Sequence, residues 1–378
     1  MKDNRRNFIR KSVGFAAAVS AGKSAAAAGV RKVTPMDSRI QNGYVRDAGM
    51  QMSEAYFDGF NQHKIALCRQ MDVLGAVAGI NPKMVGLDLK PWDLGAVRAV
   101  KNAWDNEGLK MTVIEGPPSL GEKTKLGLEG RDEEIANFIT FMGNLQKVGI
   151  DTVCYNWMPV IGWYRTDNAK RGRGGALVTA FENDDIKDTT PTQYGQVSKE
   201  QLWATLEYFL KAVVPEAERT GIKLAMHPDD PQVDQIRGIS RIMTTVDNFK
   251  RMLDIYPSPN NGITMCQGNF SLMGVDIPTV VRDLGKRKAI HFVHFRNVRG
   301  GKYRFEETFH DDGQIDMYEA MRAYYDIGFR GPIRPDHVPT MAEDSNSFPG
   351  YSTIGTLYAN GYIRGLMEAV SKEKTAHI

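Results

Sequence analysis

The chain has few cysteines, no long apolar run and no excess of either charge. It carries three cysteines in 378 residues, whereas a disulfide framework needs an even and dense set. Its net charge is +3, and its basic residues do not cluster as they do on a nucleic-acid surface. These absences exclude a disulfide-stapled domain and argue against a nucleic-acid partner.

The sequence also lacks linkers and closely paired ligands. No segment rich in Pro, Ser and Gly divides the chain after residue 50, and α/β barrels of this length are often single domains. No two cysteines lie two to four residues apart, as the ligands of a zinc finger do. With 42% hydrophobic and 25% charged residues, the composition is that of an ordinary globular protein.

The first 30 residues differ in kind from the rest. Arg5 and Arg6 precede Phe8 and Ile9, and a short apolar stretch leads to four alanines at 25–28. This order resembles a twin-arginine export signal, and the apolar stretch is too short for a membrane span of about 20 residues. A basic tail without a targeting role is the alternative.

We therefore expect a signal peptide at residues 1–30, an N-terminal extension at 31–60 and a single catalytic domain at 61–370. The protein would be periplasmic after processing, or cytoplasmic if the signal does not function. The expected partners are a small molecule and the twin-arginine translocation machinery, with no nucleic acid and no membrane after processing; assembly into a homo-oligomer is left open.

Four short apolar runs in the second half each end in a residue that can bind a metal. These residues are His227, Cys266, His294 and Asp336. A short apolar run is typical of a buried parallel strand, and the carboxyl ends of barrel strands meet on the face that carries active sites. Successive ligands are separated by enough sequence for a helix and a strand. The spacing predicts a (β/α)8 barrel with a metal site.

The remaining pattern agrees with alternating strands and helices. Strands are expected at 71–78, 109–115 and 152–157, and helices at 92–106, 132–148, 202–219 and 247–256. Residues 165–195 are polar and rich in glycine, which predicts a long loop on the strand-end face. Two imidazoles, a thiolate and a carboxylate suit Mn²⁺, Fe²⁺ or Zn²⁺ better than Mg²⁺ or Ca²⁺.

Longer strings around these residues resemble the mannonate dehydratase family. They lie at 125–128, 130–132, 154–160, 165–167, 227–231, 264–268, 294–298, 334–337 and 349–352, with His310, Gly313, Asp316 and Met317 besides. The resemblance covers residues 109–370. It implies a xylose-isomerase-like TIM barrel and the hydro-lyase reaction of D-mannonate to 2-dehydro-3-deoxy-D-gluconate and water, in hexuronate and glucuronate catabolism.

The resemblance also implies roles for individual residues. The family's metal ligands fall on the same four strand-end residues, with Mn²⁺ or Fe²⁺ as the cofactor, and its proton-transfer residues fall on His337 and Tyr351. One of these two would accept the C2 proton and the other would donate a proton to the departing C3 hydroxyl. A structural role, as a hydrogen-bond partner of a ligand for His337 and as a loop residue for Tyr351, is the alternative.

Other polar residues are candidates for substrate binding. Arg296 lies two residues beyond His294, on the same strand face, and could hold a carboxylate through two hydrogen bonds. Asn156, Arg165 and His310 are candidates for contacts with hydroxyl or carboxylate groups. A sugar isomerase or epimerase on the same barrel, or a non-catalytic periplasmic sugar-acid binder, are the alternative functions.

The first third of the chain departs from the family's pattern. Residues 77–82 and 116–121 stand where the family carries histidine-containing stretches. The second half is thus expected to keep the metal site, while the first half is altered where substrate hydroxyls would be bound.

Overall fold

The computed structural model describes residues 40–41, 44–45 and 49–376. The chain divides into two units, residues 1–38 and 39–378. The predicted signal peptide, and residues 31–39, 42–43 and 46–48 of the predicted extension, lie outside the described residues. Within the described ranges, no helix combines the length and the apolar character that a membrane span requires.

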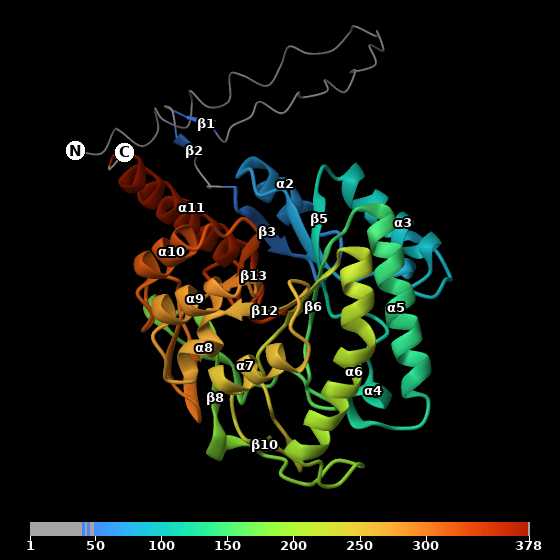
Figure 1. Ribbon diagram of the computed structural model, residues 1–378. Helices are drawn as coiled ribbons and strands as arrows, with labels where there is room; N and C mark the ends of the chain where they lie inside the picture. Colours follow the sequence, from blue (N-terminus) through green and yellow to red (C-terminus); the bar gives the residue numbers. More distant parts are fainter. Residues whose placement is uncertain (1–39, 42–43, 46–48, 377–378) are drawn as a thin grey trace, which may run out of the picture. The chain divides into compact units, whose positions relative to one another are not determined.

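In the described part of the chain, eight parallel strands close into a barrel (Figure 1). In chain order they are β3 (Gln51–Ala55), β4 (Gly75–Ala78), β5 (Lys110–Glu115), β6 (Thr152–Tyr155), β9 (Lys223–Met226), β12 (Asn261–Cys266), β13 (Ile290–Phe295) and β16 (Pro332–Pro335). Strand β16 pairs with β3 and closes the ring, so the barrel has no free sheet edge. The predicted TIM barrel is confirmed.

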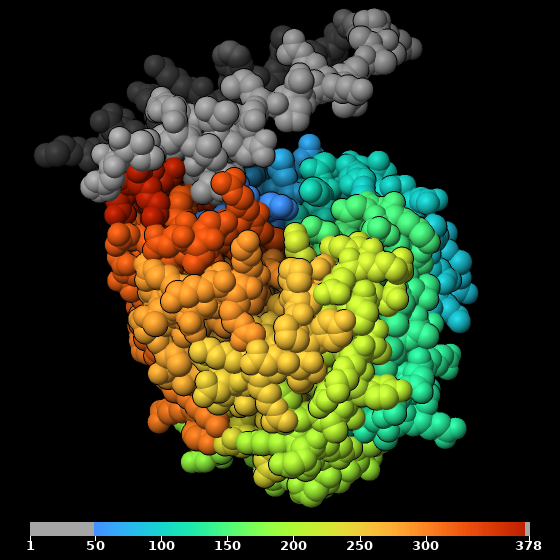
Figure 2. All heavy atoms as spheres, viewed as in Figure 1, coloured from blue at the N-terminus to red at the C-terminus, as the bar shows by residue number. Residues whose placement is uncertain are grey.

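Helices surround the barrel in chain order. They are α2 (Gln62–Gln70), α3 (Leu94–Asn106), α4 (Glu122–Leu126), α5 (Arg131–Val148), α6 (Lys199–Thr220), α7 (Val246–Ile255), α8 (Gln267–Leu272), α9 (Ile277–Lys286), α10 (Met317–Asp326) and α11 (Thr353–Ala376). Figure 2 shows the chain colours following one another around the visible face, from blue through green and yellow to orange and red. The ring of helices encloses the strands.

Short turns connect helices to the strands that follow them. Helices α5 and α6 end at Gly149 and Gly221, whose φ angles of +79° and +72° favour glycine. After each of these two glycines, the chain enters a strand within three residues. These turns place the carboxyl ends of β6 and β9 on the same face of the barrel.

The strand register sets the predicted ligands beside one another. Cys266 in β12 pairs with His294 in β13, and His294 pairs with Arg334 in β16. Every residue of β12 and β13 is buried, as the continuous apolar runs indicated. The parallel register therefore brings the ends of three ligand strands to one level.

The barrel begins earlier than the sequence indicated. Strand β3 falls in the stretch 31–60 that was expected to precede the catalytic domain, so the boundary at residue 61 is corrected to the start of β3. The strand was missed because its sequence is not apolar. Ser53 bonds to Thr112 across the barrel interior, and outside the barrel the buried Glu54 pairs with Lys64 of α2 at 2.9 Å.

Residues 165–195 do not form only a loop, and that prediction is corrected. They contain β7 (Asp167–Arg171) and β8 (Leu177–Glu182), which join β14 (Val298–Gly301) and β15 (Arg304–Glu307) in an antiparallel sheet of order β14-β15-β8-β7. Most β7 side chains are exposed, so the strand has no apolar pattern. Short pairs β1 (Ile40–Gln41) with β2 (Tyr44–Val45) and β10 (Gln235–Ile236) with β11 (Ile239–Ser240) complete the strands of the described chain.

Candidate active site

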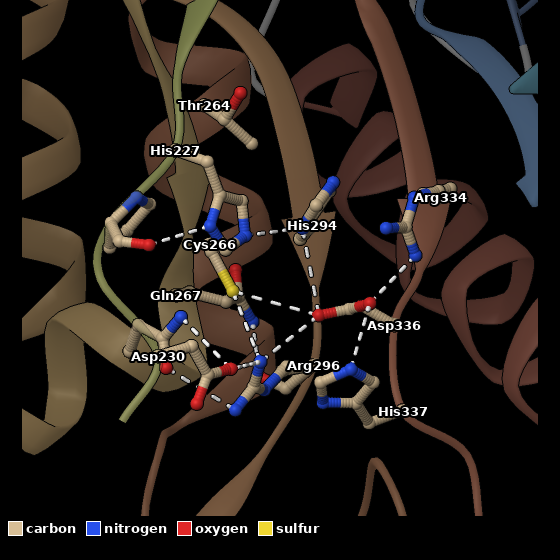
Figure 3. A network of polar contacts seen from close by, with 12 residues as sticks. His227, Asp230, Thr264, Cys266, Gln267, His294, Arg296, Arg334, Asp336 and His337 are labelled. Atoms are coloured by element: carbon tan, nitrogen blue, oxygen red, sulfur yellow. Dashed lines mark hydrogen bonds and ion pairs between the residues drawn. The ribbon is translucent and has the colours of Figure 1, made fainter. Parts of the chain in front are cut away.

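The four predicted ligands meet at the carboxyl end of the barrel (Figure 3). His227 Nε2 lies 3.2 Å from His294 Nδ1. Asp336 Oδ2 lies 3.6 Å from His294 Nδ1 and 3.6 Å from Cys266 Sγ. The donor atoms of His227, Cys266 and His294 lie within 4.8 Å of one another. The structure thus brings together the residues that the strand spacing singled out.

Each of the two imidazoles is held so that a nitrogen lone pair faces the other ring. His227 Nδ1 donates to the Pro228 carbonyl oxygen at 2.7 Å, which leaves Nε2 without hydrogen in the neutral ring. His294 Nε2 faces a Glu115 carboxylate oxygen at 3.5 Å, which favours hydrogen on Nε2 and leaves Nδ1 bare. Two lone pairs 3.2 Å apart repel each other unless a cation lies between them.

A proton is poorly suited to be that cation. Burial lowers the pKa of His227 to about 4, and it also lowers the pKa of His294. Both rings are therefore neutral at pH 7. The arrangement fits a metal ion, because neutral imidazole is the form that binds one.

Three of the distances between donor atoms fall in the range of a metal site. With bonds of ~2.1 Å to nitrogen or oxygen and ~2.3 Å to sulfur, neighbouring donors of a tetrahedral site lie about 3.4–3.6 Å apart. The three measured separations are 3.2, 3.6 and 3.6 Å. A soft thiolate beside imidazoles and a carboxylate favours a transition-metal ion over Mg²⁺ or Ca²⁺.

Two arginines stabilise the negative donors. Burial alone would raise the pKa of Asp336, but His337, Arg334, His294 and Arg296 together hold it well below its usual range. Arg334 donates to Asp336 Oδ1 at 2.8 Å, and Arg296 donates to Asp336 Oδ2 at 3.1 Å. Burial raises the pKa of the Cys266 thiol, and Arg296, 3.4 Å from its sulfur, opposes that rise.

His337 and Tyr351 lie beside the ligand Asp336. The Tyr351 hydroxyl donates to Asp336 Oδ1 at 3.3 Å, and the ring centroids of His337 and Tyr351 are 5.5 Å apart. The backbone of His337 has φ +43°, a left-handed conformation that is strained for a residue other than glycine. The next residue, Val338, bonds through its N–H to the Gly350 carbonyl. This loop geometry turns the His337 ring toward the cavity.

Glu307 is a site residue that the sequence did not reveal. It lies in β15 of the small sheet, and its Oε1 lies 3.0 Å from His337 Nδ1. The same oxygen accepts from Arg165 at 2.7 Å and from Arg296 at 2.8 Å. Because Glu307 reaches the site from outside the barrel, no strand-end spacing points to it.

Three of the four predicted substrate contacts lie behind the cavity. Arg165 and Arg296 have fully buried side chains, and both bridge Asp230 and Glu307. His310 is also buried, and burial lowers its pKa to about 4. Among the described residues, none of these three lines the cavity. The expectation that Arg296 binds the substrate carboxylate is corrected, because protein carboxylates already occupy its guanidinium.

Glu115, at the end of β5, is a second residue that the sequence reading missed. Arg334 Nη2 donates to both of its oxygens at 3.1 Å. Burial would raise the pKa of Glu115, but Arg334 and His294 lower it to about 2. The signal was present, since an acidic residue ends an apolar strand here as Asp336 follows one. Glu115, with Cys154 and His294, also forms a second group of close donors.

A cavity of about 350 Å³ opens over these groups. Its polar lining includes Glu115, His227, His294, Arg334, Asp336, His337 and Tyr351, together with Asn156. The aromatic side chains of Phe57, Trp163 and Phe348, each about 40% exposed, also line it. Of the predicted substrate contacts, Asn156 is therefore the one on the wall.

Known proteins are similar to this chain in sequence and in fold. Mannonate dehydratase 2 of Halalkalibacterium halodurans is 35% identical over 350 residues, covering 85% of this chain and 100% of that protein. The mannonate dehydratase of Streptococcus uberis is 35% identical over 351 residues, with 85% and 99% covered. The crystal structure of mannonate dehydratase from Streptococcus suis serotype 2 is similar with a TM-score of 0.79 and 33% identity, over 86% of this chain and 95% of that one.

More distant structures share the fold alone. A xylose isomerase domain protein from Planctomyces limnophilus has a TM-score of 0.53 at 13% identity, over 88% of this chain and 100% of that one. The barrel is therefore xylose-isomerase-like, as predicted. The family description of D-mannonate dehydratase (UxuA) matches residues 50–194 and 190–377. By sequence and by fold, the chain belongs to the D-mannonate dehydratase family.

Proposed function

We propose that the protein is a metal-dependent hydro-lyase that converts D-mannonate to 2-dehydro-3-deoxy-D-gluconate and water. One observation carries the proposal. Two imidazole lone pairs face each other beside a thiol and a carboxylate, and His337 and Tyr351 line the same cavity. Family membership supports the dehydration of a sugar acid. The donor set supports the dependence on a metal.

His227, Cys266, His294 and Asp336 would hold the ion, which we propose to be Mn²⁺ or Fe²⁺. When bound, the ion supplies a Lewis acid that stabilises negative charge developing on substrate oxygens. Three of the four residues are already in the form that binds a metal, because Asp336 is ionised and both imidazoles are neutral at pH 7. The Cys266 thiol would lose its proton when the ion binds. Glu115 fixes the hydrogen of His294 on the nitrogen that faces away from the other donors.

The two proton-transfer residues differ in what they can do. Glu307 accepts a hydrogen bond from His337 Nδ1, which leaves Nε2 as the nitrogen that would take up the C2 proton. Burial and the nearby Asp336 raise the pKa of Tyr351 well above its usual range. Tyr351 therefore keeps its proton, which suits a donor to the departing C3 hydroxyl. Loss of water leaves an enol, which becomes the 2-keto acid.

The test uses the full chain, stripped of metal with a chelator and reconstituted separately with Mn²⁺ and Fe²⁺. Incubation with D-mannonate and a panel of other hexonic acids should give a product lighter by one water from D-mannonate, and chelator should abolish it. Metal-replete protein that removes water from no sugar acid would refute the proposal. A product of unchanged mass would indicate an isomerase or epimerase, and tight binding without turnover would indicate a binding protein.

We further propose that the protein is exported by the twin-arginine route and acts in the periplasm on a product of hexuronate breakdown. The support is the order of Arg5, Arg6 and the following apolar and alanine-rich stretches. Cell fractionation of the wild type should place the mature chain in the periplasm. Replacing both arginines by lysine should retain the precursor in the cytoplasm; periplasmic protein from that variant would exclude this route.

A further inference from the structure

The positive groups nearest the cavity are already neutralised by protein carboxylates. Arg165 and Arg296 pair with Asp230 and Glu307. Arg334, the arginine on the cavity wall, donates to Glu115 and Asp336. A sugar acid that enters the cavity therefore meets no unpaired guanidinium among the described residues.

Lys125 of helix α4 is a positive group of a different kind. It is 9% exposed, and its ammonium donates to Asn156 Oδ1 at 3.0 Å. No carboxylate among the described residues lies within 4.0 Å of this ammonium. Burial lowers the pKa of Lys125 to about 8, as expected for a buried cation that the protein does not fully compensate. An anion bound nearby would supply the missing compensation.

Hydrogen bonding fixes the amide of Asn156 in one orientation. Its Oδ1 accepts from the Lys125 ammonium at 3.0 Å and from the backbone N–H of Met158 at 3.1 Å. Both partners can only donate, so exchanging the amide oxygen and nitrogen would leave two donors facing an NH₂ group. The Nδ2 group makes no hydrogen bond within the described chain, and Asn156 lines the cavity. Asn156 thus offers hydrogen-bond donors to whatever the cavity holds.

The strand register places this amide beside the metal donors. In the parallel pair of β6 and β9, Tyr155 lies opposite Met226. The residues that follow, Asn156 and His227, therefore leave neighbouring strands at the same level, and the His227 N–H bonds to the Tyr155 carbonyl at 2.7 Å. A ligand near the metal donors is within reach of Asn156.

We propose that Asn156, with Lys125 behind it, forms the subsite that binds the carboxylate of the sugar-acid substrate. The inference rests on the proposed dehydratase function and names the part of the substrate that this wall recognises. A carboxylate is an acceptor only and carries a negative charge, so it matches an amide N–H backed by an ammonium. Asn156 binds the substrate, and Lys125 is a positioning residue that acts through the amide.

The first test compares Asn156→Asp with Asn156→Ala on metal-reconstituted full chain, with D-mannonate as the probe. Asn156→Asp keeps the shape and can still bond to Lys125, but it turns an acceptor toward the substrate carboxylate. Its KM should rise by roughly 100-fold or more. Asn156→Ala should raise KM by roughly 10- to 100-fold, the loss of a hydrogen bond to a charged group. In both variants kcat should change much less than KM.

The second test shows whether Lys125 acts through Asn156. Lys125→Met should raise KM by about 10-fold in the wild-type background, because a hydrogen bond that orients the amide is lost. In the Asn156→Ala background the same substitution should change KM less than about 2-fold, since coupled residues are not additive. A purely structural role for Lys125 would give the same effect in both backgrounds and would overturn its assignment as a positioning residue.

The outcomes separate this inference from the proposed function. Wild-type protein that forms no 2-keto-3-deoxy acid refutes the function. Wild-type turnover with an unchanged KM in Asn156→Asp refutes the carboxylate subsite and leaves the proposed function standing. If KM rises in Asn156→Ala but not in Asn156→Asp, Asn156 accepts a hydrogen bond from a substrate hydroxyl. Thermal unfolding and metal content verify each variant. If Asn156→Asp does not fold, the other two variants and their combination decide.

Discussion

The two halves of the barrel contribute to the site in different ways. Strands β9, β12, β13 and β16 deliver the four candidate metal donors, and the chain after β16 adds His337 and Tyr351. Strands β3 to β6 contribute groups that act on other residues. Glu115 faces the imidazole of His294, and Lys125 donates to Asn156. The second half carries the candidate donors together with the two arginines that stabilise them, while the first half adds Glu115 and Lys125, which orient other side chains.

This difference bears on the expected departure of the first third from the family's pattern. The sequence predicts altered residues at 77–82 and 116–121, and the candidate donors of the second half converge. Because these donors come from four strands that neighbour one another in the ring, changes on the opposite strands would leave their register intact. The first half would then be free to vary in what it offers the substrate while the candidate metal site persists.

The largest effect is expected for Asp336→Asn, in the half that carries the donors. The amide keeps the shape but removes the negative charge, so the variant should lose bound metal and ~10³-fold or more of kcat/KM, a loss of several kcal/mol. Metal analysis and steady-state kinetics measure both. Asp283→Asn, at an exposed ion pair with Lys250, is the matched control and should behave as wild type. Full metal content in Asp336→Asn would contradict its role as a ligand.

The next largest effects are expected for His337→Asn and Tyr351→Phe, because each removes a proposed proton-transfer group and leaves the four donors in place. We expect losses of ~10²- to 10⁴-fold in kcat with little change in metal content. Exchange of the substrate's C2 hydrogen with deuterated water should stop in His337→Asn and persist in Tyr351→Phe. The reverse pattern of exchange would interchange their roles.

Lys125→Met tests how much the buried charge of Lys125, in the first half of the barrel, lowers the free energy of unfolding. Burial lowers the pKa of Lys125 from 10.5 to about 8, so the folded protein loses this proton at a lower pH than the unfolded chain does. The penalty is full below pH 8 and disappears as pH rises toward 10.5. The variant should gain up to ~3 kcal/mol in free energy of unfolding at pH 7 and almost nothing near pH 10.5. Urea titrations at both pH values measure this, and an equal gain at both would refute it.

Glu115→Gln should have the smallest effect and bears most directly on the difference between the halves. The amide cannot attract the His294 Nε2 hydrogen as strongly, so metal affinity or activity should fall by about 10- to 100-fold. A metal titration of the apo protein is the measurement. A loss as large as that of Asp336→Asn would show that Glu115 is itself a ligand, in agreement with its place in the second group of close donors.

The sequence predicted the site residues that end apolar strands. It did not reveal a strand or a site residue that is buried by contacts between separate elements. A short apolar run indicates a buried strand without reference to any other segment, and such a run precedes or contains each of His227, Cys266, His294 and Asp336. Strand β3 was missed because Glu54 is buried by pairing with Lys64, a contact between two elements. Glu307 was missed because it approaches from a sheet whose strands have exposed faces.

The same limit explains the error at Arg296. It lies directly after β13, beside the predicted donors, but the carboxylates of Asp230 and Glu307 that surround it come from the loop after β9 and from β15. A single strand does not reveal which charges of distant segments will meet it. Asn156 was placed correctly on the wall, whereas the partner that fixes its amide, Lys125, comes from another helix.

Strand β16 both leads into Asp336, the last of the candidate metal donors, and pairs with the first strand of the barrel. A ribosome delivers β3 early and residue 336 late, so the complete donor set exists only after nearly the whole chain has been made. Closure of the ring and capture of the metal then depend on the same strand docking. The rate at which metal enters refolding protein should therefore report when the barrel closes, and a slow step in closure would appear as slow activation by metal.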